Sequence, residues 1–267
     1  MYIYESGTEN KESILFLHGG DVAGWMWTPQ VAMLQDNYHC IVPDLPGYGR
    51  SNQQPWQSFT DTAQQLKTVI EKYGKNGRVH LVGLSMGGHI SLYLLSIASH
   101  LIDKVVLSGT AARPFPKSLQ RTVKLLLPLY RYGWYWKLQA RLRGYPADAA
   151  KLYVETGLGI DNPSLHRMMA EIMQSPKPLG LEKAPNPILV SAAQKDQKMI
   201  HESQLELLKI FPNAQAVIAP DVHHGWSGEN PKLFTKMMLA WLHGTALPVE
   251  LIPVEPVASE QKPVFSN

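Results

Sequence analysis

The stretch from Val79 to Gly88, VHLVGLSMGG, constrains the fold of this chain more than any other. An apolar run typical of a buried strand leads directly into Gly83-Leu84-Ser85-Met86-Gly87, and a segment of helical character follows at once. A turn this tight needs glycine where any side chain would collide with the neighbouring strand or helix. The pattern therefore predicts a strand, a sharp turn and a helix with Ser85 at the apex. The alternative is a glycine-rich turn with an incidental serine.

Size, charge and cysteine content set the broad class of protein. The 267 residues are enough for one large α/β domain or two small ones. The net charge of +3 is too small to indicate a nucleic-acid partner, and the single cysteine, Cys40, excludes an internal disulfide. No leader peptide and no apolar stretch long enough to span a membrane are visible. We therefore expect a soluble, cytoplasmic protein.

Short β-like runs alternate with helical patterns along the chain, which predicts an α/β fold with a mostly parallel central sheet flanked by helices. Runs such as Ile14–Leu17 are apolar without alternation, as expected of strands buried on both faces. The expected strands are Met1–Tyr4, Ile14–Leu17, His39–Pro43, Val79–Gly83, Lys104–Leu107, Pro187–Ser191 and Ala216–Ile218. The expected helices are Thr28–Leu34, Thr60–Tyr73, Met86–Ser99, His201–Lys209 and Pro231–Leu242.

The alternation breaks between Arg113 and Lys183, where helical patterns are interrupted by proline and glycine. We predict that residues 113–183 form a helical cap inserted between two strands of the sheet. Residues 1–112 and 184–246 would then form the core. Residues 247–267 contain four prolines and no periodicity, which indicates a loosely held, Pro-rich C-terminal tail.

Two segments that follow predicted strands could supply an acid and a base to Ser85. Asp196 follows the strand that ends at Ser191, and His223-His224 follows the strand Ala216–Ile218. A histidine there can act as general base, and an aspartate can orient it. An aspartate in such a loop is otherwise commonly a turn residue. A metal site is not expected, because adjacent histidines lack the spacing of helical ligands and no cysteine or carboxylate pattern joins them.

The segment His18-Gly19-Gly20 follows the apolar strand Ile14–Leu17. A glycine-rich turn at the end of a strand can aim a backbone N–H at a developing oxyanion. We expect the two donors to be the N–H groups of Gly20 and Met86, the residue after Ser85. A generic glycine turn is the alternative explanation.

These motifs resemble those of the α/β-hydrolase superfamily from about Ile14 to Leu242, and the chain order Ser85, Asp196, His224 is that of the superfamily. The resemblance implies an α/β-hydrolase fold, a Ser-His-Asp triad and no cofactor. Asp44–Ser51 is similar to a structural loop of the family. In the family the catalytic histidine stands five residues before the glutamate that is Glu229 here, which selects His224; His223 replaces the usual glycine.

Aromatic and basic residues suggest how a substrate is held. Candidates for lining an apolar pocket are Trp25, Trp27, Tyr130, Trp134 and Trp226, which could equally be ordinary core aromatics. Between residues 113 and 147 there are eight basic side chains and no acidic one. These side chains form either a solvated helix face or a positive rim that attracts polar or anionic substrates.

The sequence thus predicts a serine hydrolase that cleaves the ester or lactone bond of a small acyl-bearing substrate. An N-acyl-homoserine lactone is one candidate. The alternatives are a thioesterase or carbon–carbon bond hydrolase with the same triad, or a ligand-sensing protein that keeps the fold without turnover. The oligomeric state cannot be read from the sequence.

Overall fold

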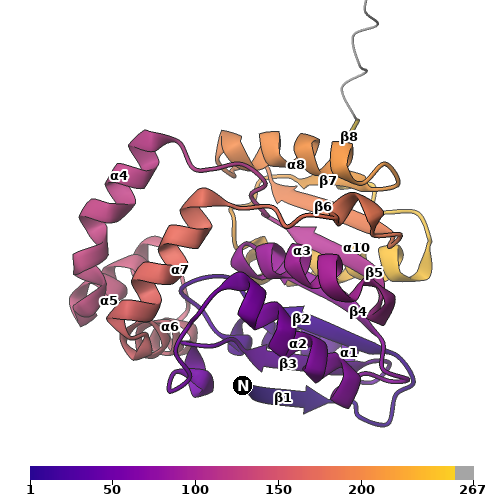
Figure 1. The fold of residues 1–267 in the computed structure, drawn as a ribbon, viewed down its shortest axis with the longest axis horizontal. Helices are drawn as coiled ribbons and strands as arrows, with labels where there is room; N and C mark the ends of the chain where they lie inside the picture. The colour runs from indigo at the N-terminus through magenta and orange to yellow at the C-terminus, as the bar shows by residue number, and fades with distance from the viewer. Residues whose placement is uncertain (256–267) are drawn as a thin grey trace, which may run out of the picture.

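The computed structural model describes residues 1–255. Its centre is an eight-stranded sheet in the order β1-β3-β2-β4-β5-β6-β7-β8 (Figure 1). The first and last strands of this order are antiparallel to their neighbours, and all other pairs are parallel. The strands are β1 (Tyr2–Ser6), β2 (Ser13–Leu17), β3 (His39–Asp44), β4 (Val79–Leu84), β5 (Ile102–Ser108), β6 (Ile188–Ala193), β7 (Gln215–Ala219) and β8 (Ile252–Val254). The predicted α/β architecture is confirmed.

Helices cover both faces of the sheet, because the side chains of each central strand alternate between two apolar cores. In β2, Leu15 and Leu17 pack with residues of α2 and α3, whereas Ile14 and Phe16 pack with residues of α1 and α10. Every residue of β2 is buried, as the run without alternation predicts. The covering helices are α1 (Thr28–Leu34), α2 (Phe59–Tyr73), α3 (Met86–Ala98), α8 (Lys198–Ile210) and α10 (Pro231–His243).

The elements between β5 and β6 are all helical, and they gather at the left of the molecule in Figure 1; we call this segment the cap. They are α4 (Lys117–Leu126), α5 (Gly133–Leu142), α6 (Ala147–Gly159) and α7 (Asn162–Gln174), with 3-10 turns η4 (Leu127–Arg131) and η5 (Leu181–Lys183). The prolines and glycines of the segment stand at or near the ends of these helices, as the sequence predicts.

One glutamate of the cap fastens α7 to the loop between β3 and α2. The Glu171 carboxylate accepts hydrogen bonds from the Trp56 indole N–H at 2.9 Å and from the Phe59 backbone N–H at 3.1 Å. The Trp56 backbone N–H also donates to the Ser164 hydroxyl at 2.8 Å. Burial raises the pKa of Glu171, and the N–H donors of Phe59 and Trp56 oppose that shift. These bonds therefore stabilise the carboxylate in its half-buried position.

The C-terminal segment differs from the predicted tail. Residues Ile252–Val254 form β8, which pairs with β7 at the edge of the sheet, and Leu251 is buried beside it. The sequence did not reveal this strand because Pro253 interrupts it, and proline is tolerated in sheets chiefly at edges. Residues 256–267 of the predicted tail lie outside the described residues. Within residues 1–255, no helix combines the length and the hydropathy needed to cross a bilayer.

Two glycines allow α3 to pack directly on β4 and β2. A Cβ atom added to Gly87 would lie 2.6 Å from the Leu17 carbonyl carbon and closer still to its oxygen. One added to Gly83 would lie 2.6 Å from the Gly87 carbonyl oxygen. These obstacles are backbone atoms, so no side-chain rotation can relieve them. The requirement for small residues around Ser85 is therefore a requirement for close approach of two backbones.

We expect Gly87→Ala to lower the free energy of unfolding by about 3 kcal/mol or more, because the new methyl group collides with the β2 backbone. Urea denaturation followed by circular dichroism measures this. Gly228→Ala is the matched control, since nothing lies within 4 Å of the added Cβ atom. Its effect should stay within about 0.5 kcal/mol. Equal effects of the two substitutions would contradict the steric explanation.

Candidate active site

Ser85 lies between β4 and α3 in a strained backbone conformation. Its φ of 55° and ψ of −113° fall in a region that non-glycine residues rarely adopt. The backbone holds this conformation from both sides, because the Ser85 N–H donates to the Ser108 carbonyl at 2.8 Å and its carbonyl accepts from Gly88 at 2.9 Å. The side chain is consequently held at the apex of the turn. Strain of this kind typically costs about 1–3 kcal/mol and is characteristic of functional sites.

His224 and Asp196 form a hydrogen-bonded pair. The His224 Nδ1 lies 2.6 Å from an Asp196 oxygen, and the aspartate side chain is only 2% exposed. The second carboxylate oxygen accepts from the Ala193 N–H at 2.9 Å, which fixes the carboxylate at the end of β6. Because a carboxylate accepts, the proton of the neutral ring sits on Nδ1 and leaves Nε2 as a base.

Close contacts tie this pair and Ser85 to the same edge of the sheet. Ser85 is bonded to Ser108, and the next residue, Gly109, lies so near His224 that an added Cβ atom would be 2.7 Å from the imidazole Cε1. On the other side of Ser85, a Cβ atom on Gly19 would lie 3.6 Å from the Ser85 Cβ. The carboxyl ends of β2, β4, β5, β6 and β7 therefore bring together residues that are far apart in sequence.

His223 points away from this arrangement. Its backbone N–H donates to Glu229 at 2.8 Å, its Nδ1 lies 3.2 Å from the same carboxylate, and its side chain is 68% exposed. The two adjacent imidazoles thus have different carboxylate partners, Glu229 for His223 and Asp196 for His224. This geometry favours His224 as the base.

His18 holds the glycine turn that follows β2. The Leu45 N–H donates to the His18 Nε2 at 3.0 Å, and the Nδ1 lies 2.8 Å from the Gly19 carbonyl. Because a backbone N–H can only donate, the ring is neutral with its proton on Nδ1. Burial lowers the pKa of His18 from 6.5 to about 4, which keeps this tautomer uncharged near neutral pH.

The N–H groups of Gly20 and Met86 are the expected oxyanion donors. Met86 is the first residue of α3, where backbone N–H groups lack an intrahelical acceptor. Neither N–H donates to an acceptor among the described residues. Gly20 itself is half-buried, and an added Cβ atom would lie 3.7 Å from the Tyr48 hydroxyl. Both N–H groups therefore remain without a protein acceptor among the described residues.

Comparison with known proteins identifies the family to which the chain belongs. The sequence model described as alpha/beta hydrolase family matches residues 14–236. The chain belongs to this family, which confirms the resemblance in its motifs. An AB hydrolase superfamily protein from Gibberella zeae is 28% identical over 257 residues, covering 94% of this chain and 87% of the relative. A 2-hydroxy-6-oxononadienedioate/2-hydroxy-6-oxononatrienedioate hydrolase from Paraburkholderia phymatum is 27% identical, covering 90% and 93%.

Solved structures of family members share the fold. A thermophilic esterase from Thermogutta terrifontis superposes with a TM-score of 0.76 at 22% identity, covering 91% of this chain and 93% of the esterase. An esterase from Exiguobacterium antarcticum gives a TM-score of 0.77 at 21% identity, covering 91% and 95%. At these identities the likeness establishes the alpha/beta hydrolase fold and not the substrate.

Two of the five aromatic residues predicted to bind substrate belong instead to the core. Trp27 is fully buried and packs against Phe16, with ring centroids 5.2 Å apart. Trp226 is also fully buried, and its indole N–H donates to the Ser108 hydroxyl at 3.0 Å. Neither ring has surface left for a ligand. The sequence could not reveal this, because an aromatic residue beside a loop can face either side of the sheet.

The other three predicted aromatic residues lie under or on the cap. Trp25 is half-buried and donates from its indole N–H to the Thr156 hydroxyl on α6 at 3.1 Å. Tyr130 is half-buried against Trp136, with ring centroids 4.8 Å apart. Trp134 is 56% exposed on the outer side of α5. Trp25 and Tyr130 therefore pack against the cap helices or within them, whereas Trp134 faces away from the core.

Asp21, the residue after Gly20, has a role that the sequence analysis did not identify. Its backbone has a positive φ of 65°, and its carboxylate lies 3.6 Å from the Arg143 guanidinium of the cap. Burial raises the pKa of Asp21, and Arg143 opposes that shift. One Asp21 oxygen is buried without a partner in the part of the chain that the structure describes. The ion pair joins the proposed oxyanion turn to the cap.

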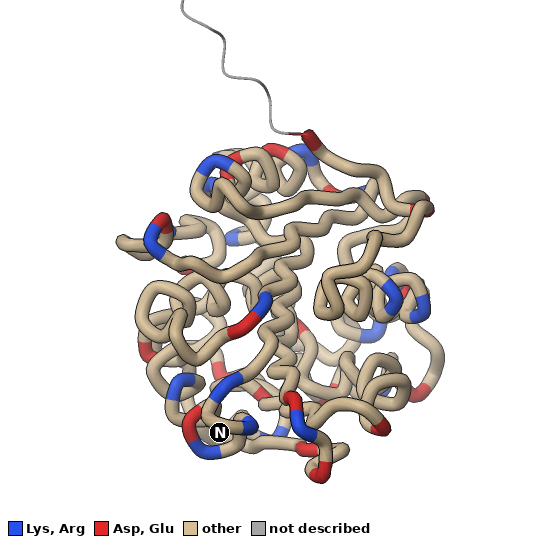
Figure 2. Tube along the Cα trace, turned by 90° about the vertical axis from the view of Figure 1, so that its right-hand side faces the viewer, with Lys and Arg blue, Asp and Glu red and all other residues tan. Residues whose placement is uncertain are grey.

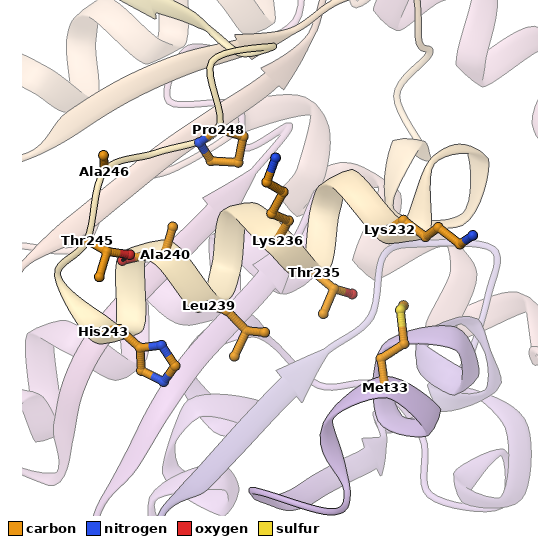
Figure 3. Close-up of a pocket in the computed structure, with 10 residues that line it drawn as sticks. All are labelled: Met33, Lys232, Thr235, Lys236, Leu239, Ala240, His243, Thr245, Ala246 and Pro248. Carbon is orange, nitrogen blue, oxygen red and sulfur yellow. Dashed lines mark hydrogen bonds between the residues drawn. The ribbon is translucent and has the colours of Figure 1, made fainter.

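Two hollows lie away from Ser85, Asp196 and His224. One, of about 490 Å³, runs along the outer side of α10 and includes Met33 of α1 (Figure 3). The other, of about 640 Å³, lies between the edge of the sheet and α6 and is lined in part by Trp25, Arg50 and Tyr2. In residues 1–255, no group of three or more His, Cys, Asp or Glu side chains is placed to hold a metal ion.

His89 generates a pH prediction. Its ring lies on α3, with Nε2 at 2.7 Å from the Ala111 carbonyl, and burial lowers its pKa from 6.5 to about 4. The unfolded chain therefore binds protons that the folded chain excludes, so this contribution to stability is complete above pH 6.5 and is lost toward pH 4. A shift of this size corresponds to about 3 kcal/mol, and His18 contributes similarly.

We expect the unfolding free energy of His89→Gln to fall less steeply between pH 6.5 and pH 4 than that of the wild type. Glutamine keeps a donor for the Ala111 carbonyl and cannot titrate, so the difference in slope reports the imidazole alone. Urea unfolding at half-unit pH steps measures both curves. Parallel curves for the two proteins would contradict the prediction.

Proposed function

We propose that this protein is a serine hydrolase that cleaves the ester or lactone bond of a small acyl-bearing substrate. The observation that carries the proposal is the strained Ser85 at the end of β4, on the same sheet edge as the His224–Asp196 pair. A serine alone is a weak nucleophile, and an adjacent oriented imidazole is what activates it.

The residues divide the reaction between them as follows. His224 removes the Ser85 proton through Nε2 while Ser85 attacks the carbonyl carbon, and Asp196 stabilises the imidazolium that forms. The N–H groups of Gly20 and Met86 stabilise the negative charge on the carbonyl oxygen. His224 then gives the proton to the leaving alcohol, and a water molecule activated by His224 releases the acyl group from Ser85.

Several features support an acyl substrate of modest size. Trp25 and Tyr130 supply apolar surface beneath the cap, and the family includes the esterases named above. An N-acyl-homoserine lactone fits such a site, as does a simple carboxylic ester. The Paraburkholderia relative, whose name describes cleavage of an oxo-dienoate, makes a carbon–carbon bond hydrolase the rival within the family.

A substrate panel tests the proposal directly. We expect the wild type to turn over p-nitrophenyl esters or acyl lactones repeatedly, and Ser85→Ala to reduce kcat by about 10⁴-fold or more. A fluorophosphonate should label Ser85, identified by peptide mass spectrometry, and should leave the Ser85→Ala variant unlabelled.

Labelling of a different serine would overturn the assignment of the nucleophile. Binding of esters and lactones without turnover would instead indicate a ligand-sensing protein. Turnover confined to thioesters or to vinylogous diketones would support the same catalytic triad but would assign a thioester or carbon–carbon bond as the one that is cleaved.

The tandem histidines give a second prediction. His224→Ala should lower kcat by about 10⁴-fold or more, since it removes the base. His223→Ala should lower kcat by less than about 10-fold, because His223 is exposed and bonded to Glu229. Initial rates on the best ester of the panel measure both. A larger loss in His223→Ala than in His224→Ala would move the base to His223.

A further inference from the structure

The outer side of the cap exposes large apolar side chains that a globular protein usually buries. No residue of α4 is buried, and Leu125 near its end is 77% exposed. On α5, Trp134 is 56% exposed and Leu142 is 72% exposed. We call this set the cap surface: Leu125, Leu126, Tyr132, Trp134, Leu138 and Leu142, each at least 36% exposed.

The spacing on α5 places the apolar members in one row. Trp134, Leu138 and Leu142 are four residues apart, so they lie on one face of the helix. Tyr132 stacks beside Trp134, with ring centroids 6.4 Å apart. Both α4 and α5 lie at the left edge of the molecule in Figure 1, on the side opposite the sheet. Their exposed rows therefore form part of the outer boundary of the protein.

Basic side chains accompany the apolar ones on α4 and α5. Of the eight basic residues between 113 and 147, Arg113 pairs with Glu202 and Arg143 pairs with Asp21. The remaining six are exposed and have no carboxylate within ion-pair distance in the described part of the chain. They are Lys117, Arg121, Lys124, Arg131, Lys137 and Arg141. Lys137 and Arg141 stand three and seven residues after Trp134, beside its row.

The side of the molecule opposite the cap has a different distribution of charged residues. Figure 2, which looks onto the side away from the cap, shows basic and acidic residues interspersed along the chain. The concentration of one sign of charge is thus a property of residues 113–147, which include α4 and α5, since the whole chain has a net charge of only +3.

We propose that the cap surface docks on an anionic lipid surface, with α5 lying parallel to the membrane plane. Leucine side chains would enter the boundary between headgroups and acyl chains, and Trp134 and Tyr132 would sit at headgroup depth, as these residue types do at membrane interfaces. The unpaired lysines and arginines would contact lipid phosphates, with their alkyl stems lying along the apolar row.

The charge of the cap surface favours an anionic lipid surface over a second copy of the chain as its binding partner. A symmetric contact through the cap surface would bring six unpaired cations of one copy against the same six of the other. An anionic bilayer neutralises them and covers the leucines at the same time. The inference is independent of the proposed hydrolysis, because none of these six cations contacts Ser85, Asp196 or His224 in the hydrogen bonds and ion pairs of the described residues.

Vesicle co-sedimentation of the full chain tests the proposal. We expect the protein to bind vesicles of 70% phosphatidylcholine and 30% phosphatidylglycerol at least 10-fold more strongly than vesicles of phosphatidylcholine alone. Raising NaCl from 100 mM to 500 mM should weaken binding several-fold, because salt screens the cations.

Two double variants separate the apolar from the charged contribution. Trp134→Ser with Leu138→Ser, and Lys137→Gln with Arg141→Gln, should each reduce binding to the anionic vesicles by about 5-fold or more. Lys198→Gln with Lys209→Gln on α8 removes the same charge from a helix outside the cap and should bind like the wild type. Thermal melting of each variant checks that it is folded.

Three outcomes would overturn the inference: no binding to anionic vesicles, equal binding to the two lipid compositions, or equal loss in the α8 control. A wild type that dimerises in sedimentation velocity, with dimers abolished by Trp134→Ser and Leu138→Ser, would assign the cap surface to a second copy instead.

Discussion

The structure depends on how closely two backbones approach at the start of α3. Gly87 lies directly against the carbonyl group of Leu17 at the end of β2, and Gly83 lies against Gly87. This approach forces Ser85 into its strained conformation and sets its N–H toward Ser108 of β5. The turns after β2, β4 and β5 are therefore fixed relative to one another before any catalytic side chain is considered. The proposed oxyanion donors and nucleophile share one rigid frame.

Much of the fold could be predicted because parallel strands leave a strong signal. Buried runs such as Ile14–Leu17 have no alternation, and in a parallel sheet whatever follows a strand arrives at the same edge. That rule alone places Ser85, Asp196 and His224 together, and the structure brings them to one edge. The edge strand at Ile252–Val254 was not predicted from the sequence, because it is three residues long and contains proline.

The residues around the proposed site were harder to predict, and the reason is long-range packing. Trp27 and Trp226 neighbour the predicted loops in sequence but face the core, because their rings fill the layer between the sheet and α10. Asp21 gave no signal, since its partner Arg143 belongs to the cap. The separation of His223 from His224 likewise depends on which carboxylate each ring meets. Side-chain direction at such positions is decided by the assembled fold and not by the local pattern.

The histidine that supports the oxyanion turn has a consequence for proton movement. His18 uses both ring nitrogens on backbone groups, and His89 is buried against a backbone carbonyl, so burial keeps both rings neutral near neutral pH. The His18 ring cannot take up a proton there without breaking one of these two structural bonds. His224 differs from His18 because only its Nδ1 is bonded, to Asp196, and no hydrogen bond of the described residues uses its Nε2. In the proposed reaction, a neutral His18 would hold the oxyanion turn at every step, while His224 would gain and lose the proton.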